Sequence, residues 1–264
     1  MLLKQLICLL ALTVTLTNNN QANAKTLRIA VASNFLETSR ELAKAFEETS
    51  EHSIQISSGS SGKIYLQIKN GAPFDLFLSA DSHKPNELVK DGLAVVSSQK
   101  TYAIGKLMLW LKDCSTQVSL TSLSSKRVKK IAIANPKLAP YGYASKKLLE
   151  NNKMWTDVSD KLIYPENIAQ VAQFAKLGVI DAALVSESNA KRLDKKDSSC
   201  LIPIKTSDYP VIAQQLVIIS KSKNRKLAKH FIQFLDSDNA KSLIKNMGYL
   251  LPNSAKIQSL PQVK

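Results

Sequence analysis

Short apolar runs typical of β-strands alternate with segments of helical periodicity from residue 27 almost to the end of the chain. The runs at 27–32 and 74–79 are compact and apolar, whereas Phe35, Leu42 and Phe46 recur at the spacing of one helix face. A strand that is followed by a helix and then by another strand fits most simply into a parallel sheet, with the helices packed on its two faces. The sequence therefore predicts an α/β fold.

The alternating pattern restarts after residue 112, which predicts two lobes rather than one. We expect strands at 27–32, 53–57, 74–79, 131–134, 180–185, 200–204 and 211–220, an extended stretch at 102–112, and helices at 35–46, 64–68, 84–90, 145–151, 167–177, 226–235 and 240–247. The extended apolar stretches near 104 and near 210 are the expected crossings between the lobes. Lobe I would then be discontinuous, with residues 25–104 and 211–264, and lobe II would hold 105–210. Such a double connection makes a hinge with a cleft between two mostly parallel, helix-flanked sheets.

The N-terminus has the three parts of an export signal. Lys4 supplies positive charge, Leu6 to Leu16 form an apolar core, and Ala22-Asn23-Ala24 is an A-x-A cleavage site. The apolar run is shorter than the roughly 20 residues that span a bilayer, so cleavage is favoured over a membrane anchor. Cys8 lies inside the apolar core, away from the cleavage point, which argues against a lipoprotein. We expect a signal peptide over 1–24, cleavage after Ala24 and a periplasmic mature protein.

The chain is strongly basic, with a formal charge of +15 that becomes +14 when Lys4 is removed. The basic residues gather at 126–130, at Lys195-Lys196 and at 221–229. None of these clusters is interleaved with aromatic residues as a nucleic-acid platform would be. We interpret them as solvated faces that give a weak attraction for anions, and we expect no nucleic-acid partner.

Two cysteines, Cys114 and Cys200, remain after the predicted cleavage. In an oxidising compartment they can pair, although sequence alone leaves open the alternative of two separate buried thiols. We favour the disulfide.

Catalytic and metal-binding patterns find little support. His52, His83 and His230 are isolated and lack ligand spacing, and no G-x-S-x-G motif is present. Asp75 and Asp81 flank a predicted strand, where a turn-capping role explains Asp81 better than acid catalysis. We expect neither an enzyme nor a resident cofactor.

Small polar residues and glycines stand where helices begin after strands. In open α/β sheets a ligand binds outside the carboxyl ends of the strands. The helix starts with this composition are Ser33-Asn34, the turn 57–63 (Ser-Ser-Gly-Ser-Ser-Gly-Lys), Pro140-Tyr141-Gly142, Glu166-Asn167-Ile168 and Val185-Ser186. Each taken alone is explained by ordinary capping. Several together favour a small oxyanion held by neutral N–H and O–H donors.

At this point the chain resembles the periplasmic molybdate-binding proteins of ABC transporters, which are type II periplasmic binding proteins. The matching segments are 32–35 (Ala-Ser-Asn-Phe), 59–64 (Gly-Ser-Ser-Gly-Lys-Ile), 71–81 (Gly-Ala-Pro-Phe-Asp-Leu-Phe-Leu-Ser-Ala-Asp) and 139–142 (Ala-Pro-Tyr-Gly). The resemblance covers essentially the whole mature chain. It implies a tetrahedral oxyanion, molybdate or tungstate, bound in the cleft by uncharged donors with no direct bond from protein to metal.

The resemblance also assigns residues to the site. The implied ligand-binding residues are Ser33, Asn34, Ser61, Tyr141 and Ile168, with Ser60 and Ser186 as weaker candidates. Tyr141 and Ile168 would act through backbone N–H groups, whereas Ser33, Asn34 and Ser61 would add side-chain donors. Some family members place a tyrosine where this chain has Ser186, so we also consider the hypothesis that the Tyr141 hydroxyl compensates.

The implied partners are the oxyanion and the membrane permease of an ABC importer, and we expect a monomer. Lys63, next to the serine turn, is expected to act only as a solvated charge at long range. Two alternatives stay open: that the ligand is another oxyanion such as sulfate or phosphate, and that the same architecture serves an enzyme.

Overall fold

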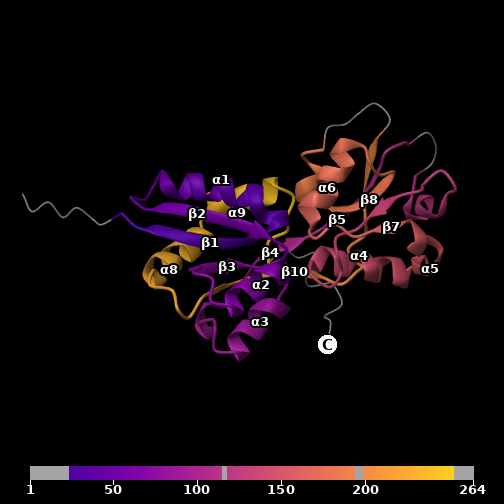
Figure 1. Cartoon of the computed structure of the whole chain (residues 1–264). Helices are drawn as coiled ribbons and strands as arrows, with labels where there is room; N and C mark the ends of the chain where they lie inside the picture. The colour runs from indigo at the N-terminus through magenta and orange to yellow at the C-terminus, as the bar shows by residue number, and fades with distance from the viewer. Residues whose placement is uncertain (1–23, 115–117, 194–198, 253–264) are drawn as a thin grey trace, which may run out of the picture.

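The computed structural model describes residues 24–114, 118–193 and 199–252. The predicted export segment at 1–23 and the basic pair Lys195-Lys196 lie outside these ranges. The described chain forms two five-stranded sheets that lie side by side, each flanked by helices (Figure 1). The α/β fold with two helix-flanked lobes is confirmed.

The first sheet has the strand order β2-β1-β3-β10-β4. Its strands are β1 (Thr26–Ala32), β2 (Ser53–Gly59), β3 (Leu76–Leu78), β4 (Lys100–Gly105) and β10 (Ile212–Ile218). The strands β1, β2 and β3 run parallel, whereas β10 is antiparallel to both of its neighbours. One reversed strand in an otherwise parallel sheet agrees with the predicted architecture.

Both faces of this sheet are covered by helices. The helices α1 (Leu36–Glu47), α8 (Arg225–Phe234) and α9 (Asp238–Asn246) pack on one face, and α2 (Ser61–Lys69) and α3 (His83–Lys90) on the other. Neighbouring residues of a strand point to opposite faces, so Ile29 joins the first cluster and Ala30 the second. Burial on both sides explains why these strands are continuously apolar.

The second sheet has the strand order β7-β6-β8-β5-β9. Its strands are β5 (Leu107–Leu111), β6 (Ile131–Ala132), β7 (Leu162–Ile163), β8 (Ala182–Ser186) and β9 (Cys200–Pro203). Here β5 is the reversed strand, antiparallel to β8 and β9. Its helices are α4 (Pro140–Asn151), α5 (Trp155–Val158), α6 (Ile168–Leu177) and α7 (Glu187–Ala190).

The short single-turn segments were not expected from the sequence. They are η1 (Ser33–Phe35), η2 (Val96–Ser98), η3 (Leu120–Ser124) and η4 (Ser159–Lys161), all 3-10 helices. The helices α5 and α7 and the two-residue strand β7 were also missed, because a segment of four residues or fewer carries no measurable periodicity.

The chain crosses between the sheets in two places. The predicted extended stretch at 102–112 divides at Lys106, with β4 in the first sheet and β5 in the second. The return crossing runs from β9 to β10, between Pro203 and Ile212. Two strands that belong to different sheets thus meet at Lys106, next to the pocket described below.

Cys114 and Cys200 form a disulfide whose Cα atoms are 6.0 Å apart. The bond ties the end of β5 to the beginning of β9, two strands that are already neighbours in the second sheet. The disulfide predicted from the sequence is therefore present in the structure. No helix in the described ranges is long and apolar enough to cross a membrane.

Candidate oxyanion-binding site

Four helical segments begin at one small pocket between the two sheets. Its lining residues are Ala32, Ser33, Asn34, Gly59, Ser60, Ser61, Ala80, Ala139, Pro140, Tyr141 and Ile168. They belong to the starts of η1 and α2 on one side and of α4 and α6 on the other. The first-turn N–H groups of a helix have no partner inside the helix, so this arrangement gathers hydrogen-bond donors around one point.

The pocket is small and electrically neutral. Its volume is about 10 Å³, counted as the space open to the centre of a water-sized sphere. About one such sphere fits, whereas sites for organic ligands commonly measure several hundred Å³. None of the lining residues is charged. The pocket is therefore a small space surrounded by uncharged groups.

The start of η1 places Ser33 and Asn34 at the pocket, both buried. The Asn34 side chain is directed elsewhere, because its Nδ2 donates to Oε1 of Gln214 at 2.8 Å and to the Tyr249 hydroxyl at 3.2 Å. The side-chain amide of Asn34 therefore bonds to the protein interior.

In the serine turn after β2, two adjacent hydroxyls accept hydrogen bonds from different backbone N–H groups. Ser60 is the N-cap of α2, and its Oγ accepts from the Lys63 backbone N–H at 3.3 Å. Ser61 Oγ accepts from the Ala80 backbone N–H at 3.0 Å. Accepting this bond leaves the Ser61 hydroxyl proton free to donate, so the structure orients Ser61 as a donor at the pocket.

The second lobe contributes two helix starts. Pro140 occupies the first turn of α4, where its missing N–H is no loss, and α4 begins five residues earlier than expected. Asn167 caps α6 by accepting from Ala169 and Gln170, and Ile168 follows it at the pocket. The side chain of Ile168 is apolar, and its backbone N–H belongs to the first turn of α6, which fits a contact through the backbone.

Tyr141 lines the pocket, but its hydroxyl is hydrogen-bonded to Gln214. The side chain is 1% exposed, and the hydroxyl accepts from Nε2 of Gln214 at 3.5 Å. Burial raises the pKa of this hydroxyl well above its usual value. The placement leaves the backbone of Tyr141 as the part available to a ligand.

Ser186 does not line the pocket. It is the N-cap of α7, and its Oγ accepts from the Asn189 N–H at 3.2 Å and donates to Asn189 Oδ1 at 2.7 Å. A capping role accounts for all of these contacts.

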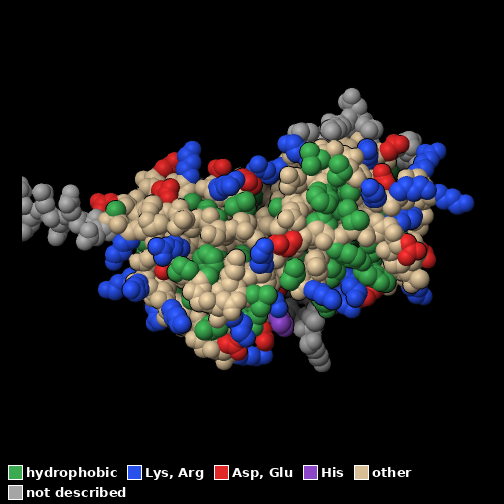
Figure 2. Space-filling model, viewed as in Figure 1, with side chains coloured by type: hydrophobic (Ala, Val, Ile, Leu, Met, Phe, Trp, Pro, Cys, Tyr) green, Lys and Arg blue, Asp and Glu red, His purple; other side chains and the backbone are tan. Residues whose placement is uncertain are grey.

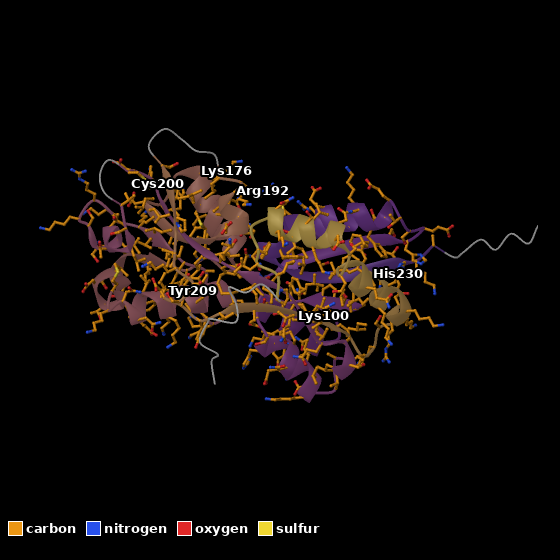
Figure 3. The ribbon with its side chains drawn as sticks, turned by 180° about the vertical axis from the view of Figure 1, so that it is seen from behind. Lys100, Lys176, Arg192, Cys200, Tyr209 and His230 are labelled. Carbon is orange, nitrogen blue, oxygen red and sulfur yellow. A yellow bond between two sulfur atoms is a disulfide. The ribbon has the colours of Figure 1, made fainter. Side chains whose placement is uncertain are left out.

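Polar contacts join the two lobes on both sides of the pocket. The Gly62 backbone N–H donates to the Leu138 carbonyl at 2.9 Å, and Lys63 Nζ lies 3.0 Å from Oε2 of Glu166. On the other side Arg192 reaches Glu37 at 2.9 Å, and Figure 3 shows Arg192 at the junction of the lobes. The two lobes are thus in direct contact on both sides of the pocket. Lys63 is a partner of lobe II rather than only a solvated charge.

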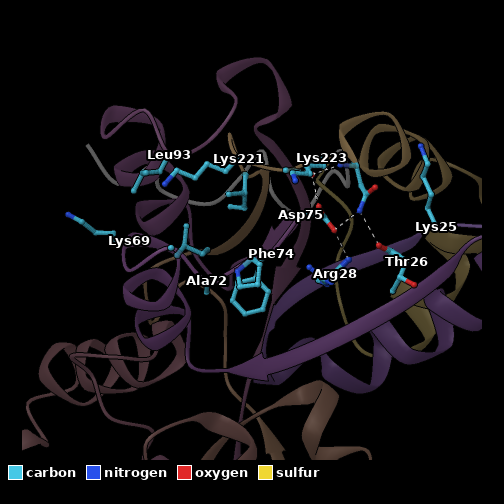
Figure 4. A pocket seen from close by; sticks show the side chains of 16 residues that line it. Lys25, Thr26, Arg28, Lys69, Ala72, Phe74, Asp75, Leu93, Lys221 and Lys223 are labelled. Atoms are coloured by element: carbon cyan, nitrogen blue, oxygen red, sulfur yellow. Dashed lines mark hydrogen bonds between the residues drawn. The ribbon is translucent and has the colours of Figure 1, made fainter.

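A much larger pocket lies at the opposite end of β1 from the small pocket (Figure 4). It measures about 600 Å³, and Arg28, Lys69 and Lys223 are among its basic lining residues. Asp75 is the buried carboxylate here, and it accepts from the Arg28 N–H at 2.9 Å and the Ser222 hydroxyl at 2.6 Å. Asp75 therefore fixes two backbone segments together, which explains its burial without catalysis.

Lysine and arginine side chains are spread over both lobes on the face seen in Figure 2 rather than gathered in one patch. Within the described ranges no group of three or more His, Cys, Asp or Glu could hold a metal ion. Asp81, whose pKa is raised by burial, accepts from the Lys84 N–H at 2.9 Å and from the Ser79 hydroxyl. Its contacts are those of a turn cap.

Comparison with known proteins decides the family. A model described as bacterial extracellular solute-binding protein matches residues 27–250. The chain belongs to this family. It is 34% identical over 229 residues to the molybdate-binding protein ModA of Azotobacter vinelandii, covering 86% of this chain and 91% of that protein. The motif-based resemblance to molybdate-binding proteins is confirmed.

Solved structures agree. The structure titled Azotobacter vinelandii periplasmic molybdate-binding protein matches with a TM-score of 0.80 and 32% identity, covering 86% of this chain and 99% of that one. The sulfate-binding protein SubI from Mycobacterium tuberculosis matches with a TM-score of 0.71 but only 14% identity, which shows the shared fold alone.

Sequence reasoning missed the polar residues behind the pocket. Gln214, Tyr249 and Ser188 form hydrogen bonds with Asn34 or with one another, although they lie 61 to 215 positions apart from their partners. No local pattern marks them, because their hydrogen-bond partners are distant in the sequence.

Proposed function

We propose that this protein is the periplasmic receptor for molybdate and tungstate of an ABC importer. The observation that carries the proposal is the neutral pocket of single-ion size at four helix starts. It is supported by the 34% identity to a molybdate-binding protein. Ser33, Asn34, Ser61, Tyr141 and Ile168 are the proposed ligand contacts, and Ser60 and Ser186 act as caps.

A dianion is stable in such a pocket if each oxygen receives donors. Burying a charge without partners is very costly, but hydrogen bonds to an ionised acceptor are about twice as strong as neutral ones. The positive ends of four helical segments add favourable potential. A lysine or arginine in the pocket is therefore unnecessary for binding.

Donors fixed on two lobes also select the ligand by its size. An oxyanion smaller than molybdate cannot reach the donors of both sides at once, and each buried donor left unpaired costs about 1–3 kcal/mol. We therefore propose that sulfate and phosphate bind more weakly than molybdate and tungstate. Binding of sulfate as tight as that of molybdate would favour the alternative receptor.

The closed form is the proposed signal to the permease. A ligand that contacts both lobes binds the closed form better than the open form and shifts the population toward it. The proposed moving units are lobe I, residues 25–104 and 211–264, and lobe II, residues 105–210. We propose a monomer that is exported by residues 1–24 and that performs no reaction.

Thermal unfolding of residues 25–264 tests the proposal. Molybdate, tungstate, sulfate and phosphate are added at equal concentration. A ligand at one hundred times its Kd stabilises the native state by about 2.7 kcal/mol. We expect a large rise in Tm with molybdate and tungstate and a small one with sulfate and phosphate. The absence of a shift with all four would reject an oxyanion receptor.

An enzymatic role has a separate test. If the fold served a reaction, turnover would depend on a titratable group, and the carboxylates to test are the buried Asp75 and the half-buried Asp81, which follows the pocket residue Ala80. We expect no turnover activity that Asp75→Asn or Asp81→Asn abolishes, and such an activity would support the enzyme.

A further inference from the structure

Gln214 is a fully buried polar side chain in the strand that returns to lobe I from lobe II. It is 0% exposed and sits on β10 at an irregularity, where the pairing of β10 with β4 shifts between Gln214 and Gln215. A bulge re-aims the side chains on its two sides. Gln214 therefore points into the junction of the lobes, whereas Gln215 bonds to Gln99 and Thr101 on the first lobe.

On the side of lobe I, Gln214 holds a residue of the oxyanion pocket. Its Oε1 accepts from Nδ2 of Asn34 at 2.8 Å and from the hydroxyl of Tyr102 at 3.2 Å. The bond to Asn34 fixes the first turn after β1, whose backbone N–H groups face the pocket. Gln214 thus determines where one set of donors stands without lining the pocket itself.

On the side of lobe II, Gln214 reaches Tyr141. Its Nε2 donates to the Tyr141 hydroxyl at 3.5 Å. The same hydroxyl packs against Gly105, where an added Cβ would overlap it, so the crossing between β4 and β5 is shaped around this side chain. Tyr141 therefore connects the pocket, through its backbone, to the two crossing strands, through its hydroxyl.

Asn34 has a second connection to lobe II. The carbonyl of Asn34 accepts from the hydroxyl of Ser188 at 3.0 Å and from that of Tyr249 at 2.7 Å. The Tyr249 hydroxyl also lies 2.8 Å from Ser188 Oγ. The polar groups behind the pocket thus form one buried network that includes residues of both lobes.

We infer that Gln214 is a positioning residue that couples occupancy of the pocket to closure of the lobes. The inference rests on the proposed oxyanion-receptor function and adds to it a residue outside the pocket that sets affinity. Gln214 is suited to this because its amide both accepts and donates, so it can bond to Asn34 of one lobe and to Tyr141 of the other at once. Both Gln214 and Tyr141 are buried, and the bond between them exists only while the two lobes are in contact.

The test compares two neighbouring glutamines on the same strand. Gln214→Met keeps the side-chain length and removes the bond to Tyr141 across the junction, together with the bonds to Asn34 and Tyr102 within lobe I. Gln215→Met is the matched control, since it removes polar contacts that lie within lobe I. Molybdate Kd is measured by calorimetry, and closure is measured as the decrease in radius of gyration on adding molybdate by small-angle X-ray scattering.

We expect Gln214→Met to raise the molybdate Kd by about tenfold or more and to reduce the scattering change at equal ligand concentration. Gln215→Met should alter the Kd by less than about twofold. Equal effects of the two substitutions would overturn the inference, because they would show a general loss of strand stability. Absence of molybdate binding by the unchanged protein would instead reject the proposed function.

A second variant approaches the same contact from the other lobe and keeps the test valid if Gln214→Met folds poorly. Tyr141→Phe removes the hydroxyl but keeps the backbone N–H at the pocket. We expect a severalfold rise in Kd, and a combined effect with Gln214→Met on log Kd that is smaller than the sum of the two single effects, because both changes remove the bond between Gln214 and Tyr141. Fully additive effects on log Kd, or an unchanged Kd in Tyr141→Phe, would contradict the coupling.

Discussion

Gly62 lies at a close contact between the two lobes, and this makes Gly62→Ala an informative perturbation. An added Cβ would lie 2.9 Å from the Leu138 carbonyl oxygen and 3.1 Å from its Cα. Both are backbone atoms of the opposite lobe, so neither can rotate away. The Gly62 N–H also donates to this same carbonyl at 2.9 Å.

The cost of the substitution falls on the closed form alone. Losing one cross-lobe hydrogen bond costs about 0.5–1.5 kcal/mol. Forcing an extra methyl group into a packed contact costs about 1–3 kcal/mol. The sum of about 1.5–4.5 kcal/mol corresponds to a rise of about 10-fold to 2000-fold in the molybdate Kd. In an open form the alanine meets no opposite lobe, and within α2 it is about 1 kcal/mol more favourable than glycine.

Calorimetric titration with molybdate and thermal unfolding without ligand measure the two effects separately. We expect weaker binding together with an unfolding temperature that is unchanged or slightly higher. Leu66→Ala is the control, since Leu66 is 51% exposed on the same helix and does not line the pocket. It should bind molybdate within about threefold of the unchanged protein.

The opposite pattern would refute the reasoning. If Gly62→Ala binds molybdate as tightly as the unchanged protein, the close contact between Gly62 and Leu138 does not belong to the liganded form. The helix starts would then not converge on the anion in the manner described.

Three further predictions follow from single contacts. Ser61→Ala removes a donor to the anion and should raise the molybdate Kd about 10-fold to 150-fold in calorimetry, as expected for a hydrogen bond to a charged group; an unchanged Kd would exclude Ser61 as a ligand. Burial raises the pKa of Tyr209 to about 12. The unfolded chain therefore ionises first, and the stability lost between pH 10 and pH 12 in denaturant titrations should be smaller by about 2.7 kcal/mol in Tyr209→Phe than in the unchanged protein. Replacing Cys114 and Cys200 with serine should lower the free energy of unfolding by about 2–5 kcal/mol and leave molybdate binding intact, because the bond lies away from the pocket residues.

Much of the fold was predictable from local patterns. The strand at 26–32 and the helix at 36–47 have clear periodicities, because each element buries a regular set of apolar side chains against one sheet. The crossing near 104 was predictable because the apolar stretch there is too long for one strand of ordinary length.

The candidate site was predictable only in part. Ser33, Ser61 and Ile168 are indicated by their positions at helix starts after strands, and the structure brings them to one pocket. Gln214 was not predictable, because its role depends on a bulge and on partners 180 and 73 positions away in sequence. The direction of the Asn34 side chain was unexpected for the same reason. Long-range polar contacts leave no periodic trace in a single sequence.

A crystal structure of residues 25–264 grown with molybdate, with the molybdenum atom located by its anomalous scattering, is the most direct test of the central claim. We predict one molybdenum site between the starts of η1 and α2 on one side and of α4 and α6 on the other, with its oxygens within hydrogen-bond distance of Ser61 and of backbone N–H groups. Molybdate found instead among the basic side chains of the larger pocket at Arg28 and Lys223, or absent from the crystal, would contradict the assignment of the neutral pocket as the site.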